Sequence, residues 1–148
     1  MTHHLLPDQR VTMVTLGVRD LDRAKAFYHA LGWRPAREME GVAFYQMQGG
    51  WVVGLYPLSD LADDLDRDPA SLGTGAVTLA QNHGSEEEVD AAIHRAIQAG
   101  ATPMKSAQAT AWGGYSGYVA DPDGHVWEIS HNPFWPLSED GSLALPPE

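Results

Sequence analysis

Several short stretches of the chain alternate between hydrophobic and polar residues, and this period of two predicts β-strands. Val14, Leu16 and Val18 follow the pattern and would share one face of the first strand. Strands are expected at residues 11–18, 42–47, 51–56 and 76–82. The Asp-Pro-Asp-Gly sequence at 121–124 favours a tight turn, so the residues on either side of it are expected to form a hairpin.

Two other stretches place apolar residues three or four positions apart, which predicts amphipathic helices. Asp20 is suited to cap the first helix and Gly32 to end it. Ser85 and Glu88 match a capping box at the start of the second helix, and Gly100 would end it. The side chains expected to be buried between helices and strands are Phe27, Leu31, Ile93, Ile97, Val14, Leu16, Val77 and Leu79.

The order of these elements repeats along the chain. Each half contains a strand, a helix and then further strands, so the prediction is an α+β fold of two βαβββ modules. The modules are expected at residues 10–57 and 75–131, joined by an acidic linker at 58–74, within a single domain at 1–148. Two twisted sheets, each with its helix on one face, can enclose a cleft between their other faces. That cleft is the expected binding site.

Composition excludes several classes of function. The chain has 9 Lys and Arg against 20 Asp and Glu, a formal net charge of −11, and no cysteine. This charge repels phosphate backbones and anionic lipids, so neither nucleic acid nor a membrane is an expected partner. No apolar run approaches the length of a membrane span, and the amino-terminal ten residues lack the apolar core of a secretory signal. A cytoplasmic location is therefore expected.

Two longer segments carry a family resemblance. WGGYSGYVADPDGHVWEISHNP at 112–133 and VTLGVRDLDRAKAFYHALGW at 14–33 resemble the vicinal oxygen chelate superfamily, which includes glyoxalase I, extradiol dioxygenases and bleomycin resistance proteins. The likeness is to a glyoxalase-like branch. It implies paired βαβββ modules, usually in a homodimer, and in the metal-dependent members one divalent ion held in the cleft.

The resemblance also implies where metal ligands would stand. The corresponding positions are Met13, Gly54, Thr78 and Glu128. A thioether, a glycine and a lone hydroxyl are poor ligands for a hard divalent ion, and one carboxylate alone does not make a catalytic metal site. His125 stands three residues from Glu128, an odd separation that points their side chains to opposite faces of a strand. We therefore expect no metal and no cofactor, with a divalent metal as the alternative.

The remaining cleft residues are predicted from strand pairing. Placing Val119 opposite Val126 brings Val119, Glu128 and, loosely, Tyr115 to one face. The candidate ligand-binding residues are Met13, Tyr45, Val52, Gly54, Thr78, Trp112, Tyr115, Val119 and Glu128. Glu128 is expected to point into the cleft within reach of Thr78.

The expected function is metal-independent binding of a small aromatic or cationic organic molecule in this cleft. The alternative is a glyoxalase- or lyase-type enzyme that uses Glu128 as acid or base, or as a lone metal ligand.

Overall fold

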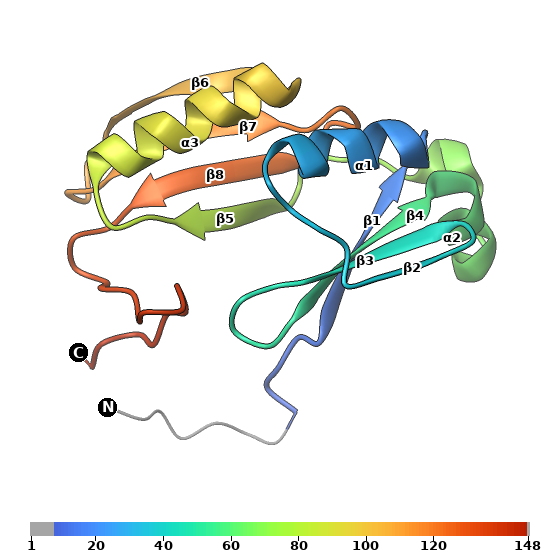
Figure 1. The fold of residues 1–148 in the computed structure, drawn as a ribbon, viewed down its shortest axis with the longest axis horizontal. Helices are drawn as coiled ribbons and strands as arrows, with labels where there is room; N and C mark the ends of the chain where they lie inside the picture. The colour runs from blue at the N-terminus through green and yellow to red at the C-terminus, as the bar shows by residue number, and fades with distance from the viewer. Residues whose placement is uncertain (1–7, 148) are drawn as a thin grey trace.

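A computed structural model describes residues 8–147, and it contains two four-stranded sheets (Figure 1). The first half consists of β1 (Met13–Val18), α1 (Leu21–Ala30), β2 (Arg37–Met39), β3 (Val42–Gln46) and β4 (Val52–Pro57). The second half consists of β5 (Thr78–Asn82), α3 (Glu86–Ala99), β6 (Thr102–Ala109), β7 (Tyr115–Ala120) and β8 (Val126–His131). Between them lie α2 (Leu58–Leu65) and a short 3-10 helix (Pro69–Ser71).

The two sheets have the same topology. Their strand orders are β1-β4-β3-β2 and β5-β8-β7-β6. In each sheet the first strand pairs in parallel with the last strand of its half, and the other pairs are antiparallel. The expected α+β fold of two βαβββ modules is confirmed.

The ends of the two main helices follow from local sequence. The Asp20 side chain accepts a hydrogen bond from the Arg23 backbone N–H, and Ser85 Oγ accepts one from Glu88 at 3.1 Å. Each cap satisfies a backbone donor that the first helical turn leaves unpaired. Gly100 ends α3 at a φ of 116°, a left-handed value that glycine adopts without steric penalty.

Both helices lie on the same side of the molecule, α1 over the first sheet and α3 over the second, and the opposite sheet faces point away from them (Figure 1). The core occupies the helix-facing side. Its fully buried large side chains are Val18, Tyr28, Tyr45, Val53, Leu55, Val89 and Val119. We call the faces that point away from the helices the open faces.

Two of the expected core residues are exposed. Ile97 is 42% exposed because the buried stripe of α3 runs through Val89, Ala92 and Ala96, and Ile97 lies to one side of it. Val77 is 70% exposed because it precedes β5, which begins at Thr78. Phe27 and Leu16 are buried as expected.

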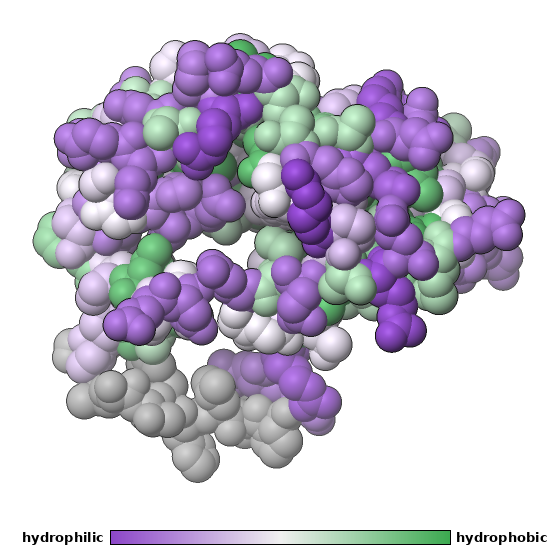
Figure 2. Space-filling view, viewed as in Figure 1, coloured by the Kyte–Doolittle hydropathy of each residue, from purple (hydrophilic) through white to green (hydrophobic). Residues whose placement is uncertain are grey.

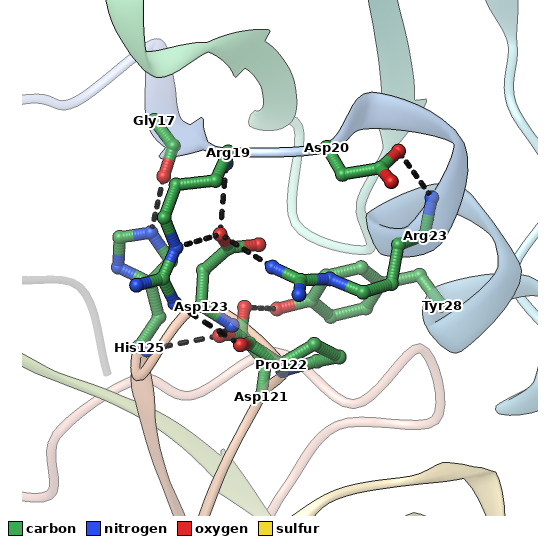
Figure 3. Close-up of polar contacts among 9 residues, drawn as sticks. All are labelled: Gly17, Arg19, Asp20, Arg23, Tyr28, Asp121, Pro122, Asp123 and His125. Carbon is green, nitrogen blue, oxygen red and sulfur yellow. Dashed lines mark hydrogen bonds and ion pairs between the residues drawn. The ribbon is translucent and has the colours of Figure 1, made fainter.

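The turn that joins β7 and β8 also joins the two modules (Figure 3). Asp123 Oδ1 accepts hydrogen bonds from the Arg19 backbone N–H at 2.8 Å, Arg19 Nε at 3.2 Å and Arg23 Nη2 at 3.1 Å. Arg19 precedes α1, and Arg23 lies in its first turn. Because the Asp123 side chain is almost fully buried, these charge-assisted bonds hold the turn against the first module.

Asp121 ties the same turn to the aromatic core. Tyr28 donates a hydrogen bond to Asp121 Oδ2 at 2.6 Å, while the backbone N–H groups of Asp123 and His125 donate to Oδ1 at 2.9 Å. Trp127 Nε1 donates to the Tyr28 hydroxyl at 3.0 Å. Burial, followed by the nearby Asp121 charge, raises the Tyr28 pKa well above its usual value, so the phenol stays protonated. This network fixes where β8 begins, and so where Glu128 falls.

Candidate functional site

The pairing of β7 with β8 differs from the expected pairing by one residue. Val119 faces Trp127, and Tyr118 faces Glu128. The expected pairing of Val119 with Val126 is wrong because the turn is one residue longer: the Asp121 N–H bonds to the His125 carbonyl, so pairing continues from Ala120 and Val126. A shift of one residue moves every side chain of a strand to the other face of its sheet.

This shift removes two residues from the candidate site. Val119 is 2% exposed and packs in the helix-facing core. The hydroxyl of Tyr115 donates to Asp90 Oδ1 on α3 at 2.7 Å, which raises the Tyr115 pKa. Both side chains lie on the side opposite Glu128.

The first module has the same correction. Tyr45, expected on the same face as Gly54, pairs with Val53, and it is Phe44 that pairs with Gly54. Tyr45 is therefore on the helix side, 1% exposed, with its hydroxyl 2.9 Å from His29 Nε2, and burial raises its pKa to about 12. Met13 and Gly54 do share the open face: a Cβ added at Gly54 would lie 3.5 Å from Met13 Sδ. Val52, two residues from Gly54 along β4, lies on this face as well.

Glu128 lies on the open face of the second sheet, half-buried. Its Oε2 accepts a hydrogen bond from the Tyr118 hydroxyl at 2.6 Å. This bond, followed by burial and the Glu128 charge, raises the Tyr118 pKa, so the phenol remains a donor at neutral pH. The expected contact with Thr78 gives way to this one, because Glu128 pairs with Ala80 while Thr78 pairs with Val126.

A cavity of about 680 Å³ adjoins Glu128. Its walls come from β5, β8, the 110–114 turn and the C-terminal segment, by which we mean residues 132–147. The lining includes Ala80, Asn82, Trp112, Glu128, Ser130 and Phe134. In the space-filling view the surface is open beneath this sheet, between the sheet and the C-terminal segment (Figure 2). The volume is in the range of sites that hold small organic ligands.

Trp112 reaches the cavity from a tight turn. The Thr110 N–H bonds to the Gly114 carbonyl at 3.0 Å, and the Gly114 N–H bonds to Thr110 Oγ1 at 2.9 Å. The indole of Trp112 lies so close to Gly114 that an added Cβ there would be 2.0 Å from its ring. Gly114 therefore permits the position of the Trp112 ring.

The residues that the fold family would use for a metal do not fit one. Met13 offers a soft thioether, Gly54 has no side chain, and Thr78 offers an exposed neutral hydroxyl, so Glu128 is the one carboxylate of the four. Nowhere between residues 8 and 147 do three His, Cys, Asp or Glu side chains gather in a way that could hold a metal ion. The donor set thus offers one carboxylate where a catalytic divalent ion needs about three protein ligands.

Sequence reasoning missed three features of the site: Tyr118, the Ser116–Ser130 hydroxyl pair at 2.8 Å, and the C-terminal segment. The first two follow from the true register. Asp121 carries the signal that could have revealed it, because an aspartate at the first position of such a turn commonly bonds the backbone ahead of it. Nothing in the pattern of the C-terminal segment indicates where it lies.

The arrangement of sheets and helices agrees with a family model. Residues 10–129 match the model described as Glyoxalase/Bleomycin resistance protein/Dioxygenase superfamily. The chain belongs to this superfamily. The resemblance drawn from the sequence is therefore confirmed. Within residues 8–147, no helix of this superfamily member is long and apolar enough to cross a membrane.

Several relatives of this superfamily member have known sequences or structures. It is 43% identical over 130 residues to an uncharacterized protein of Mycobacterium bovis, covering 87% of this chain and 80% of that one. A glyoxalase-related enzyme from Fulvimarina pelagi is 38% identical, with a TM-score of 0.85 and coverage of 93% and 98%. A family enzyme from Burkholderia phytofirmans, 22% identical with a TM-score of 0.72 and coverage of 81% and 96%, shows the shared fold.

Proposed function

We propose that this chain is a metal-independent small-molecule-binding protein that takes an aromatic or cationic organic ligand in the cavity beside Glu128. The observation that carries the proposal is the Glu128 carboxylate, which lines a cavity of about 680 Å³ and is oriented by the Tyr118 hydroxyl. Tyr118 occupies one of its oxygens, which leaves the other for a ligand.

Metal independence is supported by the donor set. Three of the four positions that the family uses for ligands are occupied by Met13, Gly54 and Thr78. Met13 offers a soft thioether, Gly54 has no side chain, and Thr78 offers a neutral hydroxyl. Elemental analysis of the purified protein tests this part of the proposal. We expect substoichiometric metal, whereas one tightly bound nickel, zinc, iron or manganese ion per chain would overturn it.

The binding experiment has two stages. A thermal-shift screen of aromatic and cationic metabolites identifies a ligand, and isothermal titration calorimetry then compares the wild type with Glu128→Gln. Loss of a charge-assisted hydrogen bond is typically worth about 1.5–3 kcal/mol, so we expect affinity to fall roughly 10- to 100-fold. Glu40→Gln, at an exposed position of the first module, is the control and should bind like the wild type. Unchanged affinity in Glu128→Gln would remove Glu128 from the site.

One observation favours a second function. The hydrogen bond from Tyr118 holds the Glu128 carboxylate in one orientation, as an acid or base in a glyoxalase- or lyase-type reaction requires. Analysis of the ligand after prolonged incubation separates the two functions. Recovery of unchanged ligand supports binding alone, and conversion that disappears in Glu128→Gln supports an enzyme.

We also propose that the protein is a cytoplasmic homodimer in which both modules, with their linker, act as one domain. Met13 is 44% exposed on the open face of the first sheet, beside the half-buried Val52 and Phe44. A second copy would cover this apolar surface, in a two-fold interface. Light scattering after size exclusion at micromolar concentrations should give twice the chain mass, and a monomer across that range would contradict the dimer.

A further inference from the structure

The C-terminal segment has a defined course without forming a helix or a strand. It leaves β8 next to His131, whose Nδ1 lies 2.9 Å from the His83 carbonyl oxygen. A later turn is closed by hydrogen bonds from the Gly141 N–H to the Ser138 carbonyl and from the Ser138 N–H to the Ser142 carbonyl, both 2.9 Å. The segment runs on the side of β5 and β8 away from α3 (Figure 1).

Contacts with both modules hold the segment there. The Phe134 ring packs on the 110–114 turn, so closely that a Cβ added at Gly113 would be 3.0 Å from it. At its far end, Gly141 packs against the hairpin between β3 and β4, where an added Cβ would be 2.8 Å from Gln48 Oε1. The segment therefore spans from the second module to the first, beneath the open face that carries Glu128.

The segment brings aromatic side chains to the Glu128 cavity. Phe134 and Trp135 line it together with Trp112, and the three are 64%, 40% and 49% exposed. Exposed apolar side chains that cluster around one cavity commonly mark a ligand-binding surface. Aromatic faces attract cations, and the attraction grows when the cation is partly removed from water.

We propose that the C-terminal segment is a wall of the ligand site and that, with Trp112, it selects a protonated amine carried on an aromatic or aliphatic body. This inference rests on the proposed function, because it uses the same cavity. The ammonium group would bind the Glu128 carboxylate, and the apolar body would lie against Trp112, Phe134 and Trp135. Anionic molecules are disfavoured by Glu128 itself and by the net charge of −11.

Three probes of similar size separate charge from aromatic contact: 2-phenylethylamine, 2-phenylethanol and phenylacetate. Titration calorimetry at low salt should show the amine binding about tenfold more tightly than the alcohol, with phenylacetate weakest. Glu128→Gln should bring the amine to the affinity of the alcohol. Trp135→Ala should weaken the binding of both probes, because the ring contacts the apolar body of each, and it should weaken the amine somewhat more, because the ring also attracts the ammonium group. Met104→Ala, an exposed apolar side chain on β6, is the matched control and should change neither.

Gly114→Ala provides an independent variant. The added methyl group would lie 2.0 Å from the Trp112 ring and 2.8 Å from the His131 backbone carbonyl oxygen, so it displaces the ring and strains the backbone where β8 ends, without removing any aromatic side chain. Amine affinity should therefore fall about fivefold or more while the circular dichroism spectrum is retained.

Equal binding of the amine and the alcohol would overturn the amine selectivity, and wild-type binding by Trp135→Ala and Gly114→Ala would overturn the wall. In both cases the proposed function stands, because a ligand still occupies the Glu128 cavity. If none of the three probes binds at millimolar concentration, the amine inference fails. The metabolite screen then decides the proposed function separately.

Discussion

The two modules share one topology but carry different chemistry on their open faces. In the first, the side chains of Met13 and Phe44 meet over Gly54, and the exposed Arg37 is the strand partner of Phe44. In the second, Glu128 and Tyr118 form a hydrogen-bonded pair beside a cavity. The same framework therefore occurs twice, and the side chains it carries place the candidate site in the second half.

The last hairpin turn of each module also differs between the two halves, in how deeply it is buried. The turn at 121–125 is buried against α1 through Asp121 and Asp123, whereas Gln48 in the corresponding turn of the first module is exposed. The second turn thus carries the junction between the modules as well as the register of β8. Stability and site geometry are linked in the second module, and this link can be tested.

The largest expected effect is at the junction. Asp121→Ala removes the acceptor of three hydrogen bonds, so the Tyr28 O–H and two backbone N–H groups lose their acceptor, while the Tyr28 oxygen still accepts from Trp127 Nε1. We expect the free energy of unfolding to fall by about 3–5 kcal/mol. Urea unfolding measures it, and Gln48→Ala in the equivalent turn should change it by no more than about 0.5 kcal/mol. Similar losses in both variants would mean that the two turns are equivalent.

A second pair of substitutions tests the register of the second module. Val119→Ala opens a gap in the helix-facing core and should cost about 2–3 kcal/mol. Val126→Ala, on the half-buried opposite side, should cost less than about 1 kcal/mol. Thermal and urea unfolding show which of the two variants loses more stability. The reverse order would place Val119 back on the open face.

Glycines at matched depth give a third contrast between the modules. A Cβ at Gly117 on β7 would lie 2.6 Å from Ile93 Cδ1 and 2.9 Å from a backbone nitrogen, so Gly117→Ala should destabilise by about 1–3 kcal/mol. At Gly54 on β4 the nearest atoms are 3.5 Å away. Gly54→Ala should therefore stay within about 1 kcal/mol of the wild type. Chemical unfolding of both variants checks this. Equal effects would show that the helix-facing side at Gly117 and the open face at Gly54 are packed equally tightly.

The smallest effect concerns His83, at the end of β5. Burial lowers its pKa, which the Glu88 charge partly offsets, so the folded state holds the neutral ring more firmly than the unfolded chain does. Its contribution to stability is therefore complete above the ordinary pKa of about 6.5 and is lost as pH falls toward the folded value. An NMR titration should find an imidazole whose pKa lies below that value, and its signal should be absent from His83→Gln. A His83 that titrates at or above 6.5 would contradict the burial.

The sequence by itself determined the elements whose causes are local. Asp20, Ser85 and Gly100 act within one helical turn of their own positions, so the helix ends could be predicted from neighbouring residues. The repeat of strand, helix and strands, with the apolar stripes, was enough to predict the paired modules. That Glu128 is the lone carboxylate among the family's ligand positions followed from the resemblance, which supplied the positions, together with the residue types found there.

Tertiary structure decided what depends on contacts between distant segments. The register of β7 with β8 is set by Asp121, which bonds Tyr28 ninety-three positions away in the chain, and this one-residue difference moved Val119 and Tyr115 to the core side. Tyr118 became the partner of Glu128 for the same reason. The C-terminal segment has no periodicity to place it, and tertiary contacts, among them the packing of Phe134 on Gly113 and of Gly141 on Gln48, bring it beneath the second sheet. Hydrophobic pattern specifies which face of an element is buried, but it does not specify which distant surface meets it.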